Sequence, residues 1–99
     1  MLLPHAHTLS RARTALAALA DTAPTIDTSS EYEHVLIELD RIHGDQCPAL
    51  SKTQVTHSRK TLLAIATTAI DDLTTYGVDP LDVELVLAML EDAAGADGA

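Results

Sequence analysis

Residues 79–94 of the 99-residue chain read DPLDVELVLAMLEDAA. This stretch decides the fold because it predicts a helix that is apolar on two sides. Asp79 followed by Pro80 is a typical helix start, with an acidic N-cap and a proline at the first helical position. One apolar stripe comprises Val83, Val86, Leu87, Leu90 and Ala94. A second stripe, nearly opposite on the helical wheel, comprises Leu81, Leu85 and Met89. A helix of this kind needs cover on both sides, which predicts a bundle whose last helix also contacts another molecule. The alternative is that the monomer itself covers both stripes.

Two helices are predicted near the start of the chain. The first covers residues 8–21, where apolar residues recur at spacings of three and four, and Pro24 ends it. The second starts at Ser29 or Ser30, both good N-caps, and stops at Gly44. The apolar stripe of the second helix comprises Tyr32, Val35, Leu36, Leu39, Ile42 and His43.

The third predicted helix, residues 52–76, is the longest of the four. Ser51 caps its start and Gly77 stops it. Its apolar seam comprises Val55, Leu62, Ala66, Ala69, Leu73 and Tyr76, widened by Leu63, Ile65 and Ile70. No strand-like alternation interrupts these patterns. We therefore predict an all-α fold, a small up-and-down bundle of about four helices with short loops. Residues 1–94 form one helical domain and residues 95–99 a flexible tail.

The composition is acidic and poor in aromatic residues. Six Lys and Arg stand against fifteen Asp and Glu, giving a formal net charge of −9, and every basic residue precedes position 61. This balance opposes binding a phosphate backbone over a broad face. With 2% aromatic residues, a stacking platform for bases or sugars is hard to build. A single cysteine, no secretory pattern and no membrane-spanning apolar run predict a cytoplasmic protein without a membrane segment.

Two short constellations contain metal-ligating residue types. Glu31 and His34 form a Glu-x-x-His unit of the kind found in di-iron bundles, and a dimer could add Glu84 or Glu91. The wheel, however, places Glu31, His34, Glu38 and Arg41 on a solvated face. The second constellation is the loop that contains Cys47, which follows His43 at the end of the preceding helix. A tetrahedral zinc site needs four ligands, and this loop has only one sulfur. We predict no metal, no cofactor and no catalytic residue here, and none at His5 and His7 near the N-terminus.

Residues 50–60, LSKTQVTHSRK, resemble the start of a recognition helix in a helix-turn-helix protein. Small polar residues followed by basic ones suit base edges and phosphates in a major groove. This resemblance implies a DNA-binding regulator, the alternative function. Its nucleic-acid residues would be Lys52, Gln54, Thr56, Arg59 and Lys60.

Interaction with another protein is the function that the sequence favours. Phosphate loops, paired cysteines and nucleophile elbows are all missing from the sequence, which argues against an enzyme. We expect a non-catalytic regulator, inhibitor or accessory subunit that forms a homodimer or binds a heterologous protein. A dimeric metal-binding bundle is a second alternative. The predicted partner-binding residues are Leu81, Leu85, Met89, Asp71, Asp72, Asp79 and Asp82.

Overall fold

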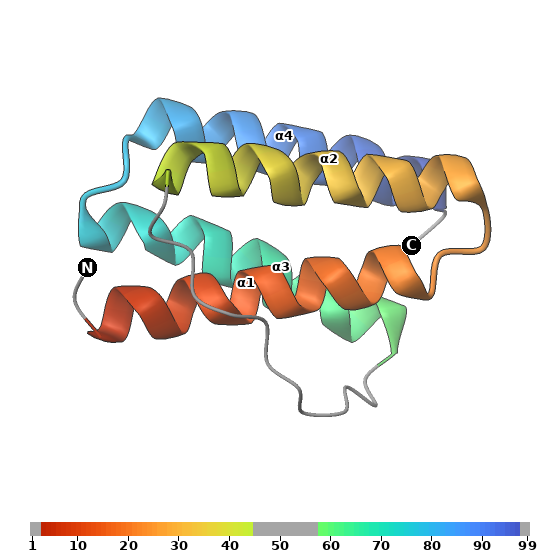
Figure 1. Ribbon diagram of the computed structural model, residues 1–99, viewed down its shortest axis with the longest axis horizontal. Helices are drawn as coiled ribbons and strands as arrows, with labels where there is room; N and C mark the ends of the chain where they lie inside the picture. Colours follow the sequence, from red (N-terminus) through yellow and green to blue (C-terminus); the bar gives the residue numbers. More distant parts are fainter. Residues whose placement is uncertain (1–2, 45–57, 98–99) are drawn as a thin grey trace.

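The predicted four-helix, all-α bundle is confirmed by the computed structural model, which describes residues 3–44 and 58–97 (Figure 1). The α-helices are α1 (Leu3–Asp21), α2 (Ile26–His43), α3 (Arg59–Asp72) and α4 (Pro80–Asp97). A short 3₁₀ helix, η1 (Leu73–Tyr76), continues α3. Within these described ranges the chain contains no strand.

The four helices form a ring in the order α1, α2, α4, α3. α1 packs against α2 and α3, α4 packs against the same two helices, and the diagonal pairs stay apart. Each helix is antiparallel to both neighbours, so the diagonal helices α2 and α3 run in the same direction (Figure 1). The α1–α2 and α3–α4 connections are short, as predicted. The α2–α3 connection, whose residues 45–57 lie outside the described part, instead joins opposite ends of the bundle.

The two ends of the bundle carry different side chains. At one end, which we call the His5 end, the start of α1 meets the end of α2, the end of η1 and the start of α4. At the other, the Arg59 end, the start of α3 meets the ends of α1 and α4. The axial core between these ends is apolar. Its largest fully buried side chains are Tyr32, Leu9, Leu16, Leu19, Leu39, Ile70, Leu73, Leu90, Val35 and Val86.

The starts of the first two helices differ from the prediction. α1 begins at Leu3 rather than at residue 8, because a proline such as Pro4 is tolerated in the first turn, where its missing N–H leaves no hydrogen bond unmade. α2 begins at Ile26 rather than after Ser29 or Ser30. Its N-cap is Thr25, whose hydroxyl oxygen accepts the backbone N–H of Thr28 at 3.1 Å.

The third helix is not the longest, and its predicted start is wrong. Its N-cap is Ser58 rather than Ser51, because the Ser58 hydroxyl accepts the N–H of Thr61 at 3.2 Å. α3 has 14 residues and η1 adds 4, whereas α1 has 19. Gly77 ends η1 as predicted, with a left-handed φ of 91° that glycine adopts without strain.

The last helix extends beyond its predicted end. α4 starts at Pro80 as expected, and the carboxylate of Asp79 accepts the N–H of Leu81 at 2.9 Å. It then continues to Asp97, so residues 95–97 are helical rather than part of a flexible tail. The cause is the Asp97 side chain, which is only 2% exposed and ion-paired with Arg59.

Candidate functional site

The second apolar stripe of α4 is largely uncovered in the monomer. Leu81 is 73% exposed and Leu85 is 49% exposed, while Met89 is half-buried against the core. Leu81 and Leu85 lie one helical turn apart and therefore neighbour each other on the outer surface. We call Leu81, Leu85 and Met89 the α4 face. The first stripe of the same helix is buried, with Val86 at 0% and Leu90 at 2% exposure.

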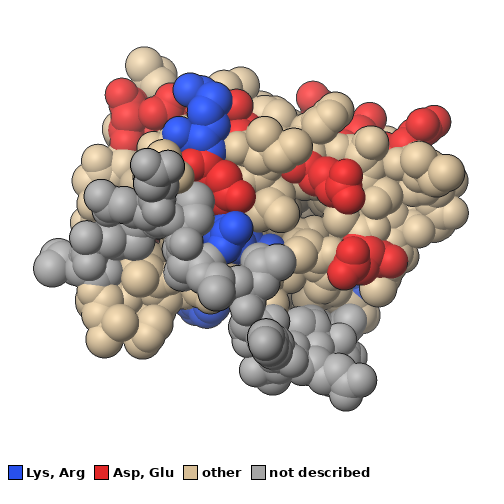
Figure 2. Space-filling view, viewed as in Figure 1, with Lys and Arg blue, Asp and Glu red and all other residues tan. Residues whose placement is uncertain are grey.

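The four predicted acidic partner residues gather at the His5 end. Asp71 and Asp72 are exposed in the last turn of α3, and Asp79 and Asp82 lie around the first turn of α4. The end of α3 adds the negative pole of its own helix dipole. Red carboxylates are spread over the α2 and α4 side of the molecule in Figure 2, with few blue cations between them.

One exposed cation lies beside this acidic end. Arg41 near the end of α2 forms an ion pair with Glu38, which raises the pKa of Arg41, and the nearby charge of Asp82 raises it further. In return, the hydrogen bond from Arg41 lowers the pKa of Glu38. An exposed pair of this kind contributes little to stability, so its effect is to keep the surface beside Asp82 polar.

The Glu-x-x-His unit lies on the surface of α2. Glu31 and His34 are both exposed on the outer side of α2, as the wheel predicted. Among residues 3–44 and 58–97, no three His, Cys, Asp or Glu side chains come together in a way that could hold a metal ion. Cys47 lies outside the described residues.

The predicted nucleic-acid residues are only partly described. Lys52, Gln54 and Thr56 lie outside the described residues, and Lys60 is exposed on α3. Arg59 points inward, where it pairs with Asp97 at 2.7 Å and donates to the carbonyl oxygen of Leu19 at 3.1 Å. The guanidinium of Arg59 therefore makes its hydrogen bonds within the bundle rather than facing a DNA backbone.

Arg59 belongs to a polar cluster that the sequence analysis missed. Its guanidinium lies 5.7 Å from the ring centre of Tyr32, a distance at which a cation and an aromatic face attract each other. The Tyr32 hydroxyl donates to Asp97 at 2.9 Å. Burial, followed by this hydrogen bond, raises the pKa of Tyr32 to about 12. The pattern offered no signal, because Tyr32, Arg59 and Asp97 are far apart in sequence.

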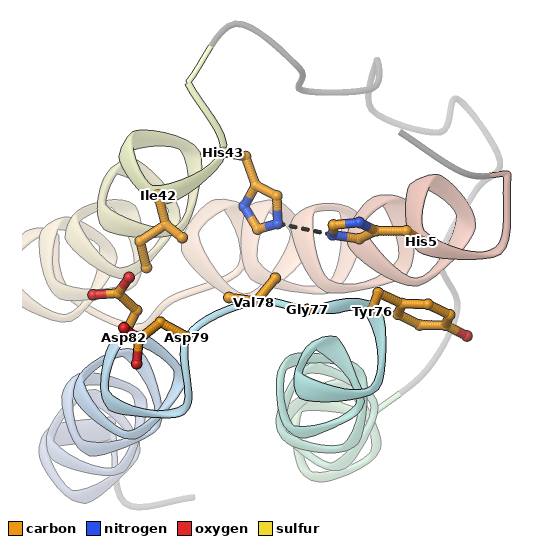
Figure 3. A pocket seen from close by; sticks show the side chains of 8 residues that line it. All are labelled: His5, Ile42, His43, Tyr76, Gly77, Val78, Asp79 and Asp82. Atoms are coloured by element: carbon orange, nitrogen blue, oxygen red, sulfur yellow. Dashed lines mark hydrogen bonds between the residues drawn. The ribbon is translucent and has the colours of Figure 1, made fainter.

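A pocket at the His5 end was also missed. It measures about 310 Å³ and is lined by His5, Ile42, His43, Tyr76, Gly77, Val78, Asp79 and Asp82. Figure 3 shows the two imidazoles side by side and joined by a hydrogen bond, with Asp79 and Asp82 on the far side of Val78. The Nε2 atoms of His5 and His43 lie 3.1 Å apart. The sequence signal that could have helped is Pro4. Read as a residue of the first helical turn, it would have placed His5 in α1, although not its contact with His43.

Hydrogen bonds fix the protons of the histidine pair. His43 Nδ1 lies 2.8 Å from the carbonyl oxygen of Leu39, which can only accept, so Nδ1 carries the proton and donates. In neutral His43 the Nε2 atom is then the acceptor of a hydrogen bond from His5 Nε2. The His5 ring also stacks on Tyr76, with ring centres 5.5 Å apart and planes inclined by 10°. Burial, and then the nearby His43, lower the pKa of His5.

Comparison with known proteins leaves the geometry as the guide to function. No protein-family model, curated protein or solved structure matches the chain. No helix in the described part has the length and apolar character that crossing a membrane requires.

Proposed function

We propose that this protein acts without catalysis, by binding another protein through the α4 face. The observation that carries the proposal is the exposure of Leu81 and Leu85, at 73% and 49%, on a helix whose opposite side packs into the core through Val83, Val86 and Leu90. Uncovering two neighbouring leucines costs hydrophobic free energy that a partner would recover on binding.

Charge favours a basic heterologous partner over a second copy. Sequence positions 61–99 contain no Lys or Arg, and carboxylates such as Asp82 and Glu84 flank the α4 face. A second copy would bring another net charge of −9 against the same acidic surface, and like charges placed together oppose association. A partner with leucines flanked by Lys or Arg would meet both the apolar and the acidic part of the face.

The test uses a defined probe, an amphipathic helical peptide of leucine and lysine, with a leucine and glutamate peptide as its charge control. We expect fluorescence anisotropy to show binding of the lysine peptide that weakens with added salt. Leu85→Asp should weaken it at least ~10-fold, since a buried unpaired charge costs more than ~1.4 kcal/mol. Ile37→Asp is the matched control, because Ile37 is 63% exposed on the outside of α2, away from α4.

Equal binding by wild type and Leu85→Asp would contradict the proposal, as would equal binding of the two peptides. Native mass spectrometry then separates the two kinds of partner. A dimer that Leu85→Asp converts to a monomer would identify a second copy as the occupant. A wild-type monomer would leave the face to a heterologous protein.

A further inference from the structure

We propose that His5 and His43 form a two-histidine binding site for a divalent late transition metal ion such as Zn²⁺, Ni²⁺ or Cu²⁺. The site joins the start of α1 to the end of α2 and opens into the pocket at the His5 end. It shares Asp82 with the acidic flank of the α4 face, but its two proposed ligands belong to α1 and α2.

The spacing of the two nitrogens fits a shared ion. At metal–nitrogen distances of ~2.0–2.1 Å, two ligands of a tetrahedral ion lie about 3.3 Å apart and two adjacent ligands of a square-planar ion about 2.9 Å apart. The Nε2 atoms of His5 and His43 are 3.1 Å apart, between these values. An ion would take the place of the proton that His5 Nε2 donates, and this proton would move through solvent to Nδ1 of His5, so that both imidazoles bind as neutral ligands through Nε2.

The tautomer of His43 is the one that a metal ligand requires. Metal-binding histidines usually donate their other ring N–H to a carbonyl or carboxylate, which orients the ring and makes the free nitrogen more basic. His43 Nδ1 makes this bond to the carbonyl oxygen of Leu39 at 2.8 Å. His43 therefore presents an Nε2 lone pair toward His5 and the pocket.

His5 is held in place by a different contact. Its imidazole stacks on the Tyr76 ring with planes inclined by 10°, which limits the orientations the imidazole can take. Tyr76 is a positioning residue in this site, since it contacts a ligand and not the ion.

The surroundings suit a hydrated cation. The pocket of about 310 Å³ has room for the waters that complete the coordination sphere, since one water occupies ~30 Å³. Asp79 and Asp82 line the same pocket and make its potential negative. Imidazole nitrogens favour Zn²⁺, Ni²⁺ and Cu²⁺ over Mg²⁺ and Ca²⁺, which prefer oxygen.

The experiment is isothermal titration of the full chain with ZnCl₂, with MgCl₂ as the negative control. We expect one equivalent of Zn²⁺ to bind, and His5→Ala or His43→Ala to lower the affinity at least ~10-fold, because losing an outer partner alone costs ~10–100-fold. His7→Ala and His34→Ala, which remove exposed histidines, are the matched controls and should bind as the wild type does. Tyr76→Ala should weaken binding, and Tyr76→Phe should restore it.

A second readout does not depend on the variants being folded. In ¹⁵N-histidine spectra of the wild type, Zn²⁺ should shift the Nε2 signals of His5 and His43 and leave His34 unchanged. Zinc binding that survives both His5→Ala and His43→Ala, with no shift at their Nε2 signals, would mean an adventitious ion only. That result, or no binding of Zn²⁺, Ni²⁺ and Cu²⁺, overturns the proposal.

Discussion

Arg59 at the start of α3 donates two hydrogen bonds to a single oxygen of Asp97 at the end of α4. The Nη2 and Nε atoms lie 2.7 and 3.1 Å from Oδ2 of Asp97, which also accepts the Tyr32 hydroxyl of α2 at 2.9 Å. Arg59 reaches α1 through the carbonyl oxygen of Leu19 at 3.1 Å. One ion pair thus connects all four helices at the Arg59 end.

Replacing Arg59 should therefore destabilise the whole bundle. Arg59→Met leaves a carboxylate that is 2% exposed with Tyr32 as its remaining donor, and we expect a loss of about 2–4 kcal/mol in the free energy of unfolding. Asp97→Asn keeps a hydrogen-bond acceptor and should cost about 1 kcal/mol. Urea unfolding followed by circular dichroism measures both. An Arg59→Met variant as stable as the wild type would show that the pair contributes nothing.

The raised pKa of Tyr32 makes stability depend on alkaline pH. The phenol ionises near 10 in the unfolded chain and at about 12 in the folded protein, so the folded state holds the proton more tightly. This contribution is complete below pH 10 and is lost as the pH rises toward 12. It amounts to on the order of 2 kcal/mol.

Tyr32→Phe isolates this effect, since phenylalanine cannot ionise. The free energy of unfolding of the wild type should fall relative to the variant between pH 10 and 12, and the difference between the two should be constant from pH 7 to 9. Parallel curves up to pH 11.5 would refute a Tyr32 proton held by the fold.

Two glycines should respond to alanine in opposite directions. Gly77 has a φ of 91°, where a Cβ is strained although no atom lies within 4 Å of it, so Gly77→Ala should cost about 1–2 kcal/mol. Gly95 lies in α4 with equally open space and no positive φ, so Gly95→Ala should stabilise by about 0.5–1 kcal/mol. Thermal unfolding of both variants gives the two signs. A destabilised Gly95→Ala would mean that α4 does not continue through this turn.

Duplex DNA should not bind appreciably to this protein. Arg59 is engaged inside the bundle, and the net charge of −9 repels a phosphate backbone. We expect no retardation in a gel shift at low salt. A shift that added salt abolishes and Lys60→Ala weakens would instead support the helix-turn-helix resemblance of residues 50–60.

The buried faces of the helices could be predicted from the sequence, and so could the start of α4, but the starts of α1, α2 and α3 could not. Leu9 and Leu16 are 0% exposed because the spacing of apolar residues dictates which side of a helix meets the core. Helix starts depend on which of several serines and threonines caps the first turn, and packing decides among them. Thr25 and Ser58 therefore cap helices for which the pattern offered Ser29, Ser30 and Ser51.

The candidate sites divide in the same way. Leu81 and Leu85 were predictable because both lie on one helix, where the wheel relates them directly. His5 and His43 meet although 38 positions separate them, and so do Arg59 and Asp97. Such meetings follow from the way the helices pack, which no pattern within one helix contains.

The shared direction of α2 and α3 has a consequence for folding kinetics. Contacts between sequence neighbours lie within the α1–α2 hairpin and the α3–α4 hairpin, whereas the α1–α3 and α2–α4 interfaces join residues distant in sequence. Forming these distant interfaces requires closing the chain across residues 44–58. This closure has an entropic cost that contacts between sequence neighbours do not incur. We therefore expect each hairpin to form before the two dock, and the docking step to limit the folding rate.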